Sequence, residues 1–292
     1  MFKSGSSVLT ATVRAGILIV SLVFLGALTG NGLPAQQAPP QTENQTEARE
    51  ALNQGVQSFK NGQYGTATWD FQRAKYLDPG LMKARLYLAT VYAAQYIPGA
   101  PGEANQELGR KAVEEFRGVL EIEPQNLSAM DGIGSILFQM AGTPYDPEAL
   151  KESRSFHQKH IQINPDDPEP YYWVGVIDWT LSFRANNELR GRYNQGAKGQ
   201  LQDRDPLPDA QRQEYVREYG SMIEEGIESL KHAIELRPDY DDAMAYLHLM
   251  YRRKADTVEF QGERDELLQT ADDLVDKVKE IKQKRAEQPS QP

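Results

Sequence analysis

The chain has 292 residues, of which 39% are hydrophobic and 25% charged, so it can bury a sizeable core in one elongated or two compact domains. Its formal net charge is −10, and no segment that we expect to fold clusters Lys and Arg, which argues against a nucleic-acid surface. The absence of cysteine excludes disulfides, thiolate metal sites and a cysteine-linked lipid anchor.

Residues 1–35 have the order of a secretory signal peptide. Lys3 and Arg14 precede an apolar run from Ala15 to Leu28. Ala35 and a polar stretch follow this run. The run is short for a membrane span, so we expect cleavage after Ala35 and export to the periplasm or the exterior of a bacterium. The alternative is an uncleaved anchor, in which residues 11–33 hold the protein at the inner membrane. Any membrane attachment is expected to come only from this segment, if it stays uncleaved.

Two polar segments border the part that we expect to fold. Residues 36–47, QQAPPQTENQTE, have adjacent prolines and no apolar periodicity, and they predict a disordered tether rich in Pro and Gln. Residues 287–292 predict a disordered tail. The helical domain is therefore expected over residues 48–286.

The clearest pattern in this domain lies between Ala51 and Pro79. Gly55 and Ala67 are twelve residues apart, where small side chains let two helices approach each other. Apolar residues at three- and four-residue spacing accompany them, Gly62 fits a turn between the helices, and Pro79 ends the second helix.

This stretch resembles a tetratricopeptide repeat (TPR). The family has a 34-residue pattern with a small residue at place eight, alanine at places twenty and twenty-seven, an aromatic at place twenty-four and proline at place thirty-two. Gly55, Ala67, Phe71, Ala74 and Pro79 match it in register. The resemblance implies an all-α fold, a TPR-type right-handed solenoid of about five helical hairpins, each burying its apolar face on the next.

Long insertions separate the later copies. The closing prolines stand at positions 79, 124, 165 and 238, which are 45, 41 and 73 residues apart. We expect the insertions between the two helices of a hairpin, at residues 96–106, 142–145, 181–208 and 252–262. Residues 181–208 are expected to include a short polar helix around residues 186–193. A last helix over residues 263–285 has polar outer faces, which suits a terminal cap.

The resemblance also places a concave groove on the first helix of each hairpin. Carried over to this sequence, the groove is apolar and aromatic, and the Lys and Asn set that clamps a peptide carboxylate in some family members is absent. The candidate partner-binding residues are Phe59, Leu86, Phe138, Tyr172, Val176, Trp179 and Leu249. The alternative is that inserted loops, or the long second helix of the fourth copy, pack onto these rings and fill the groove from within. Trp69 and Trp173 are expected to be packing residues.

His157 and His160 are three residues apart and could share one helical face. Because no third ligand stands nearby in the sequence, we expect a buried, hydrogen-bonded pair and no metal site. The sequence has no Ser-His-Asp order, no phosphate-binding glycine loop and no HExxH motif. We therefore expect no catalytic residues and no cofactor.

The sequence favours a non-enzymatic protein-protein interaction scaffold of the cell envelope, which binds a protein or peptide through its groove. One alternative is an enzyme or metal-dependent factor with a site built by residues 181–208, using Tyr193, Asp203, Asp205 or the two histidines. The other alternative is a self-assembling structural component of the envelope.

Overall fold

The computed structural model describes residues 42–196 and 200–287. These residues belong to the second of two units into which the chain divides, Gln41–Pro292. The expected signal segment and tail residues 288–292 lie outside the described residues.

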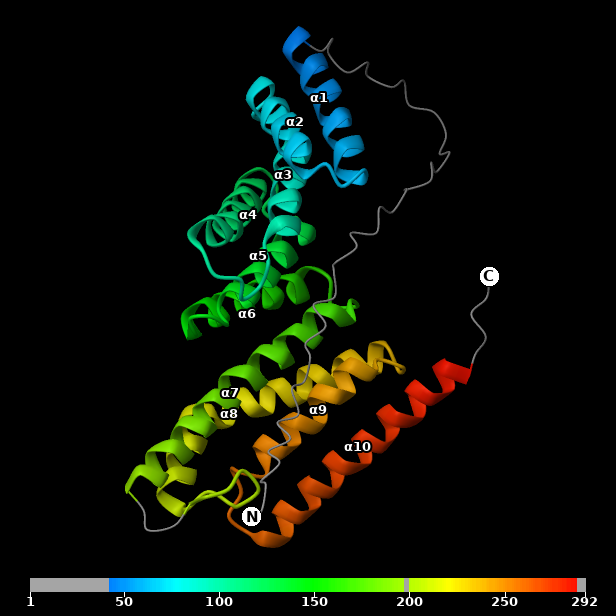
Figure 1. The fold of residues 1–292 in the computed structure, drawn as a ribbon. Coiled ribbons are helices and arrows are strands. Elements are labelled where there is room, and N and C mark those ends of the chain that lie inside the picture. Colours follow the sequence, from blue (N-terminus) through cyan, green and yellow to red (C-terminus); the bar gives the residue numbers. More distant parts are fainter. Residues whose placement is uncertain (1–41, 197–199, 288–292) are drawn as a thin grey trace, which may run out of the picture. The chain divides into compact units, whose positions relative to one another are not determined.

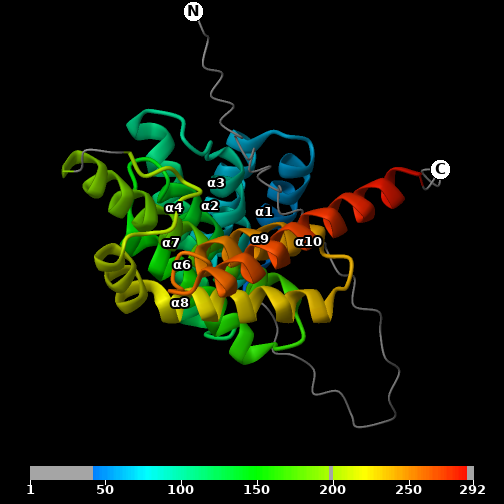
Figure 2. The same ribbon diagram turned by 90° about the horizontal axis from the view of Figure 1, so that it is seen from below.

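The described residues form ten α-helices, which follow one another as five hairpins (Figures 1 and 2). Each helix packs on the next one in the chain. The first helices of neighbouring hairpins also contact each other, in the pairs α1 with α3, α3 with α5 and α7 with α9. This confirms the predicted all-α solenoid. The helices are α1 (Glu43–Lys60), α2 (Tyr64–Leu77), α3 (Met82–Gln95), α4 (Glu103–Ile122), α5 (Leu127–Met140), α6 (Pro147–Ile163), α7 (Pro168–Gly196), α8 (Asp209–Leu236), α9 (Asp241–Lys254) and α10 (Gln261–Glu287).

Local capping sets where several helices begin. Thr42 accepts a hydrogen bond from the Gln45 amide, and the Gln45 side chain bonds back to the Thr42 amide. This capping box starts α1 at Glu43, so residues 43–47 belong to the first helix and not to the expected tether. Asn126 and Asp146 cap α5 and α6, as their positions in the sequence predict.

A glycine at place eight brings the two helices of three hairpins into close contact. A methyl group at Gly55 would lie 2.5 Å from the Phe71 ring, and one at Gly134 would lie 2.5 Å from the His157 ring. At Gly175 it would lie 2.3 Å from Cγ of Leu230. In each hairpin the second side chain stands at place twenty-four, so these pairs fix the distance between the two helices.

The fourth hairpin differs from the sequence prediction. The expected short helix around residues 186–193 is wrong, because α7 continues without a break for 29 residues. Its added turns pack along the first half of α8, where Tyr215 is fully buried and donates a hydrogen bond to the Ser182 carbonyl (3.0 Å). Leu189 is also buried there. This contact between α7 and α8 stabilises turns whose own sequence is mostly polar.

A buried charge cluster ties the end of α7 to the turn between α9 and α10. The Asp256 side chain is 1% exposed, and its Oδ1 lies 2.9 Å from Arg264 Nη1 and 3.2 Å from Arg190 Nη2. Arg190 and Arg264 also donate to the carbonyls of Gln202 and Arg204. One carboxylate thus holds two buried guanidinium groups and, through them, the loop before α8.

Two glycine substitutions in α7 test the close contact. Gly175→Ala should destabilise the protein by about 1–3 kcal/mol, because the new methyl overlaps Leu230. Gly191→Ala, in the same helix with no neighbouring atom within 4 Å, should instead stabilise it by about 0.5–1 kcal/mol. Urea unfolding followed by circular dichroism measures both. Equal effects would contradict the assigned role of Gly175.

A second comparison tests the charge cluster. Asp256→Ala leaves two buried guanidinium groups without their carboxylate, so unfolding free energy should fall by about 3–5 kcal/mol. Asp272→Ala is the control, because Asp272 is 60% exposed in its ion pair with Arg252, and its loss should cost about 1 kcal/mol or less. A similar cost for both variants in urea unfolding would show that the cluster adds little.

Candidate functional site

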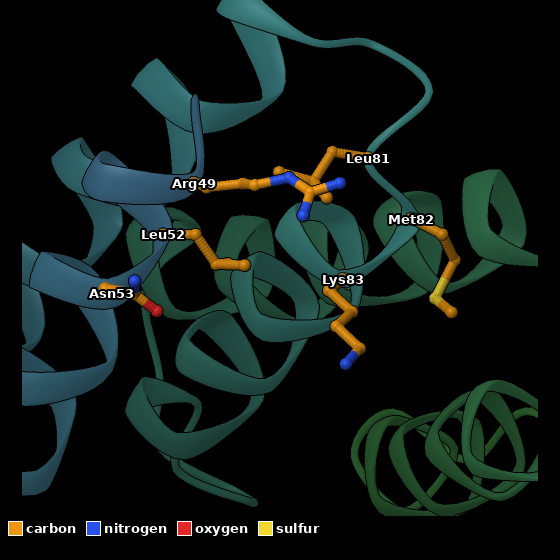
Figure 3. A pocket seen from close by; sticks show the side chains of 6 residues that line it. All are labelled: Arg49, Leu52, Asn53, Leu81, Met82 and Lys83. Atoms are coloured by element: carbon orange, nitrogen blue, oxygen red, sulfur yellow. The ribbon is translucent and has the colours of Figure 1, made fainter. Parts of the chain in front are cut away.

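A pocket of about 470 Å³ lies between the first helices of the first two hairpins (Figure 3). Arg49 and Lys83 stand 34 residues apart, at the same place of the repeat, and both line it. The Arg49 side chain extends toward Leu81 in Figure 3. The full lining is Arg49, Leu52, Asn53, Leu81, Met82 and Lys83. Two cationic side chains beside apolar ones suit an anionic group attached to an apolar chain.

Two predicted groove residues lie on these same two helices. Phe59 and Leu86 are half-buried and pack against the core cluster of the first hairpins. The Phe59 ring also contacts that of Tyr64, at 5.6 Å between centroids. Neither Arg49 nor Asn53 is among the groove residues predicted from the sequence. The 34-residue spacing of Arg49 and Lys83 was the signal that could have found Arg49.

A continuous set of ring contacts, here called the aromatic band, runs over α5, α7 and α9. It consists of Phe138, Tyr172, Trp173, Trp179, Phe183 and Tyr246, all half-buried. Successive centroids are 5.4 Å apart for Phe138–Trp173, 5.3 Å for Trp173–Tyr172, 5.8 Å for Tyr172–Tyr246, 5.5 Å for Tyr246–Trp179 and 5.0 Å for Trp179–Phe183. Such edge-on and offset contacts hold each ring in one orientation.

Three predicted groove residues, Phe138, Tyr172 and Trp179, therefore come together in one band. Leu249 on α9 is half-buried. Val176 is only 2% exposed, so it supports the helix packing and offers almost no surface.

The described ring contacts of Tyr172 and Trp179 come from α7 and from α9 with its N-cap Tyr240. One of these rings, Phe183, belongs to the expected insertion at residues 181–208, which here continues α7. Burial, followed by the nearby Tyr246, raises the pKa of Tyr172 well above its ordinary value. The phenol is therefore neutral at physiological pH, and the band presents uncharged rings.

The two tryptophans expected to pack behave differently. Trp173 packs on Phe138, Tyr172 and His157, which confirms the expectation. Trp69 is 59% exposed on α2, with the Arg73 guanidinium 5.8 Å from its ring, so the expectation is wrong there.

The two histidines of α6 are both buried, as expected, but only His160 has a hydrogen bond. His160 Nδ1 lies 2.7 Å from Oδ1 of Asp131, whereas neither ring nitrogen of His157 has a hydrogen-bond partner in the described structure. His157 stacks on Trp173 at 5.9 Å. Burial, with a smaller effect of His160, lowers the pKa of His157 to about 3. No group of three metal-ligating side chains is found within residues 42–196 and 200–287.

The residues of the alternative enzymatic hypothesis lie at the end of α7 and in the following loop. Asp205 accepts a hydrogen bond from the Gln202 amide (2.8 Å) and so holds the loop backbone. Asp203 is exposed and Tyr193 half-buried. Within the described ranges, no helix is both long and apolar enough to cross a membrane.

Comparison with known proteins identifies the fold. No protein-family model matches the chain, and no curated protein matches it in sequence. Among solved structures, a MamA protein aligns over 84% of this chain and 98% of its own, with a TM-score of 0.55 and 16% identity. MamA from Desulfovibrio magneticus RS-1, from residue 41 to its end, covers 82% and 96%, with a TM-score of 0.53 and 16% identity.

A third structure, YrrB, is described as a TPR protein with an unusual peptide-binding site. It aligns over 80% of this chain and 88% of its own, with a TM-score of 0.50 and 17% identity. Stacked helical hairpins with a small residue at place eight define an α-solenoid. The similar structures define it further: the chain has the tetratricopeptide-repeat fold.

His157→Phe tests the unpartnered histidine. A folded pKa of about 3 lies below the unfolded value, so the native state resists protonation and loses stability as pH falls below about 6.5. Wild type should lose about 2–3 kcal/mol more than His157→Phe between pH 6.5 and 4.5. His232→Phe, at a side chain 42% exposed on α8, is the control. Urea unfolding at both pH values measures the difference, and parallel pH profiles for wild type and His157→Phe would contradict it.

Proposed function

We propose that this protein is a non-enzymatic scaffold that binds an extended segment of another protein along the first helices of its hairpins. The observation that carries the proposal is the aromatic band, an unbroken row of half-buried rings on α5, α7 and α9. The similarity to YrrB, which is described as having a peptide-binding site, supports the same kind of ligand.

The band has the properties of a binding anchor. Aromatic side chains that pack against one another lose little further freedom when a partner covers them, so the remaining exposed apolar area can contribute about 25 cal/mol per Å². Trp and Tyr are also the residue types that dominate binding energy at protein interfaces. Apolar side chains of the partner segment would therefore lie on Tyr172 and Trp179.

The pocket between α1 and α3 gives the bound segment a direction. The chain as a whole carries a formal net charge of −10, yet Arg49 and Lys83 place two cations in this pocket. A carboxylate of the partner would be attracted to that end. We infer a segment with an acidic group toward α1 and apolar side chains toward α9.

The place of action that we propose is the cell envelope. It rests on the signal-like order of residues 1–35, with cleavage after Ala35, and the alternative is an inner-membrane anchor at residues 11–33. Fractionation of host cells, with amino-terminal sequencing of the protein, distinguishes a cleaved and soluble exported form from an anchored one. Recovery in the cytoplasm with residues 1–35 intact would contradict both.

Two tryptophan variants, one on α7 and one on α2, test the binding surface. Trp179→Ala should reduce capture of the partner from host extract by roughly thirtyfold, because loss of an anchoring ring costs about 2 kcal/mol or more. Trp69→Ala, which removes an exposed ring from α2, should leave capture unchanged. Quantitative mass spectrometry of the captured proteins measures both, and circular dichroism checks helical content.

Two results would contradict the proposal. Equal loss from both variants would mean that the aromatic band has no special role. Collapse of the fold in Trp179→Ala would mean that Trp179 belongs to the core and that the groove assignment is wrong.

A further inference from the structure

The apolar core thins out where the third hairpin meets the fourth. One core cluster covers α1 to α6 and another covers α7 to α10. Between them lies a third, which contains only four buried apolar residues: Ala141, Leu150, Ile177 and Leu181. Both α5 and α7 pack on α6 there. The rings of Trp173, Phe138 and His157 also cross this junction, so it is held by a small apolar cluster, by ring contacts and by polar contacts.

One imidazole bridges two carboxylates at this junction. His160 Nδ1 is hydrogen-bonded to Oδ1 of Asp131 on α5 (2.7 Å). Its Nε2 lies 3.4 Å from Oδ2 of Asp167 in the turn before α7, which is within ion-pair distance, but no hydrogen bond joins these two atoms. The His160 side chain is 3% exposed, against 29% and 30% for the two carboxylates. Asp167 Oδ1 in turn accepts a hydrogen bond from the Glu169 amide (2.9 Å), in the first turn of α7. The ring therefore connects the body of α5 to the start of α7.

We propose that doubly protonated His160 is a clamp that holds α5 to the start of α7, and that this clamp opens when the proton leaves. An imidazolium can donate from both nitrogens and places a positive charge between the two carboxylates. Neutral imidazole can donate from only one nitrogen. The hydrogen bond to Asp131 can remain, but Asp167 loses its ion pair, because that contact depends on the charge of the ring.

The surroundings of His160 favour the charged form. Burial opposes the charge, but the hydrogen bond and the charge of Asp131, together with the charge of Asp167, raise the pKa of His160 above its ordinary value. The other titratable group facing it is His157 on α6, which stays neutral because its own pKa is lowered. From α7 the nearby side chain is the uncharged Trp173, stacked on His157.

The sign of the pH dependence follows. Because the folded pKa is above the unfolded value, the clamp contributes its full stability below about pH 6.5 and loses it as pH rises through the folded pKa.

The clamp involves two of the helices that carry the aromatic band. Asp131 is on the same helix as Phe138, and Asp167 is at the start of the helix that carries Tyr172 and Trp173. Opening the clamp would change the distance between these rings, so partner binding should weaken as pH rises. That consequence rests on the proposed function, whereas the clamp itself needs no partner.

Proton NMR of the full chain tests the clamp directly. The chain has four histidines, and His160→Gln identifies the resonance of His160 by its loss. We expect the His160 midpoint above pH 6.5 in wild type and a clear downward shift in Asp167→Asn, which keeps the ability to cap α7. Asp146→Asn is the matched control, because Asp146 caps α6 in the same way. A wild-type midpoint at or below 6.5, or equal shifts in both variants, would overturn the proposal.

Urea unfolding gives a second and independent result. The midpoint of wild type should exceed that of Asp167→Asn and of His160→Gln at pH 6, and the excess should shrink or vanish at pH 9. An excess of the same size at both pH values would mean that the residues only fill space or cap a helix, and would overturn the clamp. Neither measurement involves a partner, so failure of the clamp and failure of the capture experiment with Trp179→Ala are separate outcomes.

Discussion

The structure depends on how closely two helices approach each other within a hairpin. Gly55 against Phe71, Gly134 against His157 and Gly175 against Leu230 repeat one contact with three different partners, and none of these glycines has room for a methyl group. Because the contact fixes the helix pair, it also fixes which residues of each first helix face the side opposite the second helix. The aromatic band and the cationic pocket both lie on first helices, so their positions follow from this constraint.

The insertions extend the repeat and also reach the band, since they supply Phe183 and place the Arg253 guanidinium 5.7 Å from its ring centre. The added turns of α7 and α8 bury Tyr215 and Leu189 between them, and the Asp256 cluster fastens the loop that follows. The repeat thus tolerates a long insertion because that insertion brings its own apolar and ionic contacts. The fourth hairpin then has two functions, to carry rings of the band and to stabilise its own extension.

The sequence predicted what depends on short-range spacing. The helix pair around Gly55, Ala67 and Phe71 and the caps at Asn126 and Asp146 could be found because each needs only residues close in the chain. The continuity of α7 and the Asp256 cluster could not, since they depend on contacts between residues up to 70 positions apart. The exposed Trp69 escaped prediction for a related reason: what covers a ring depends on elements that its local sequence does not specify. For the site, repeat register brought three of seven candidate residues into one band, but it did not distinguish the buried Val176 from the half-buried Tyr172 and Trp179.

The central claim is that a partner segment lies on the aromatic band, and crosslinking in intact host cells tests it most directly. A photoreactive residue would replace Trp179 on α7 and, as the control, Tyr76, which is 84% exposed on α2. The account predicts one distinct protein crosslinked from position 179 and absent from position 76. The same crosslinked proteins from both positions, or none from position 179 in a correctly folded variant, would contradict it.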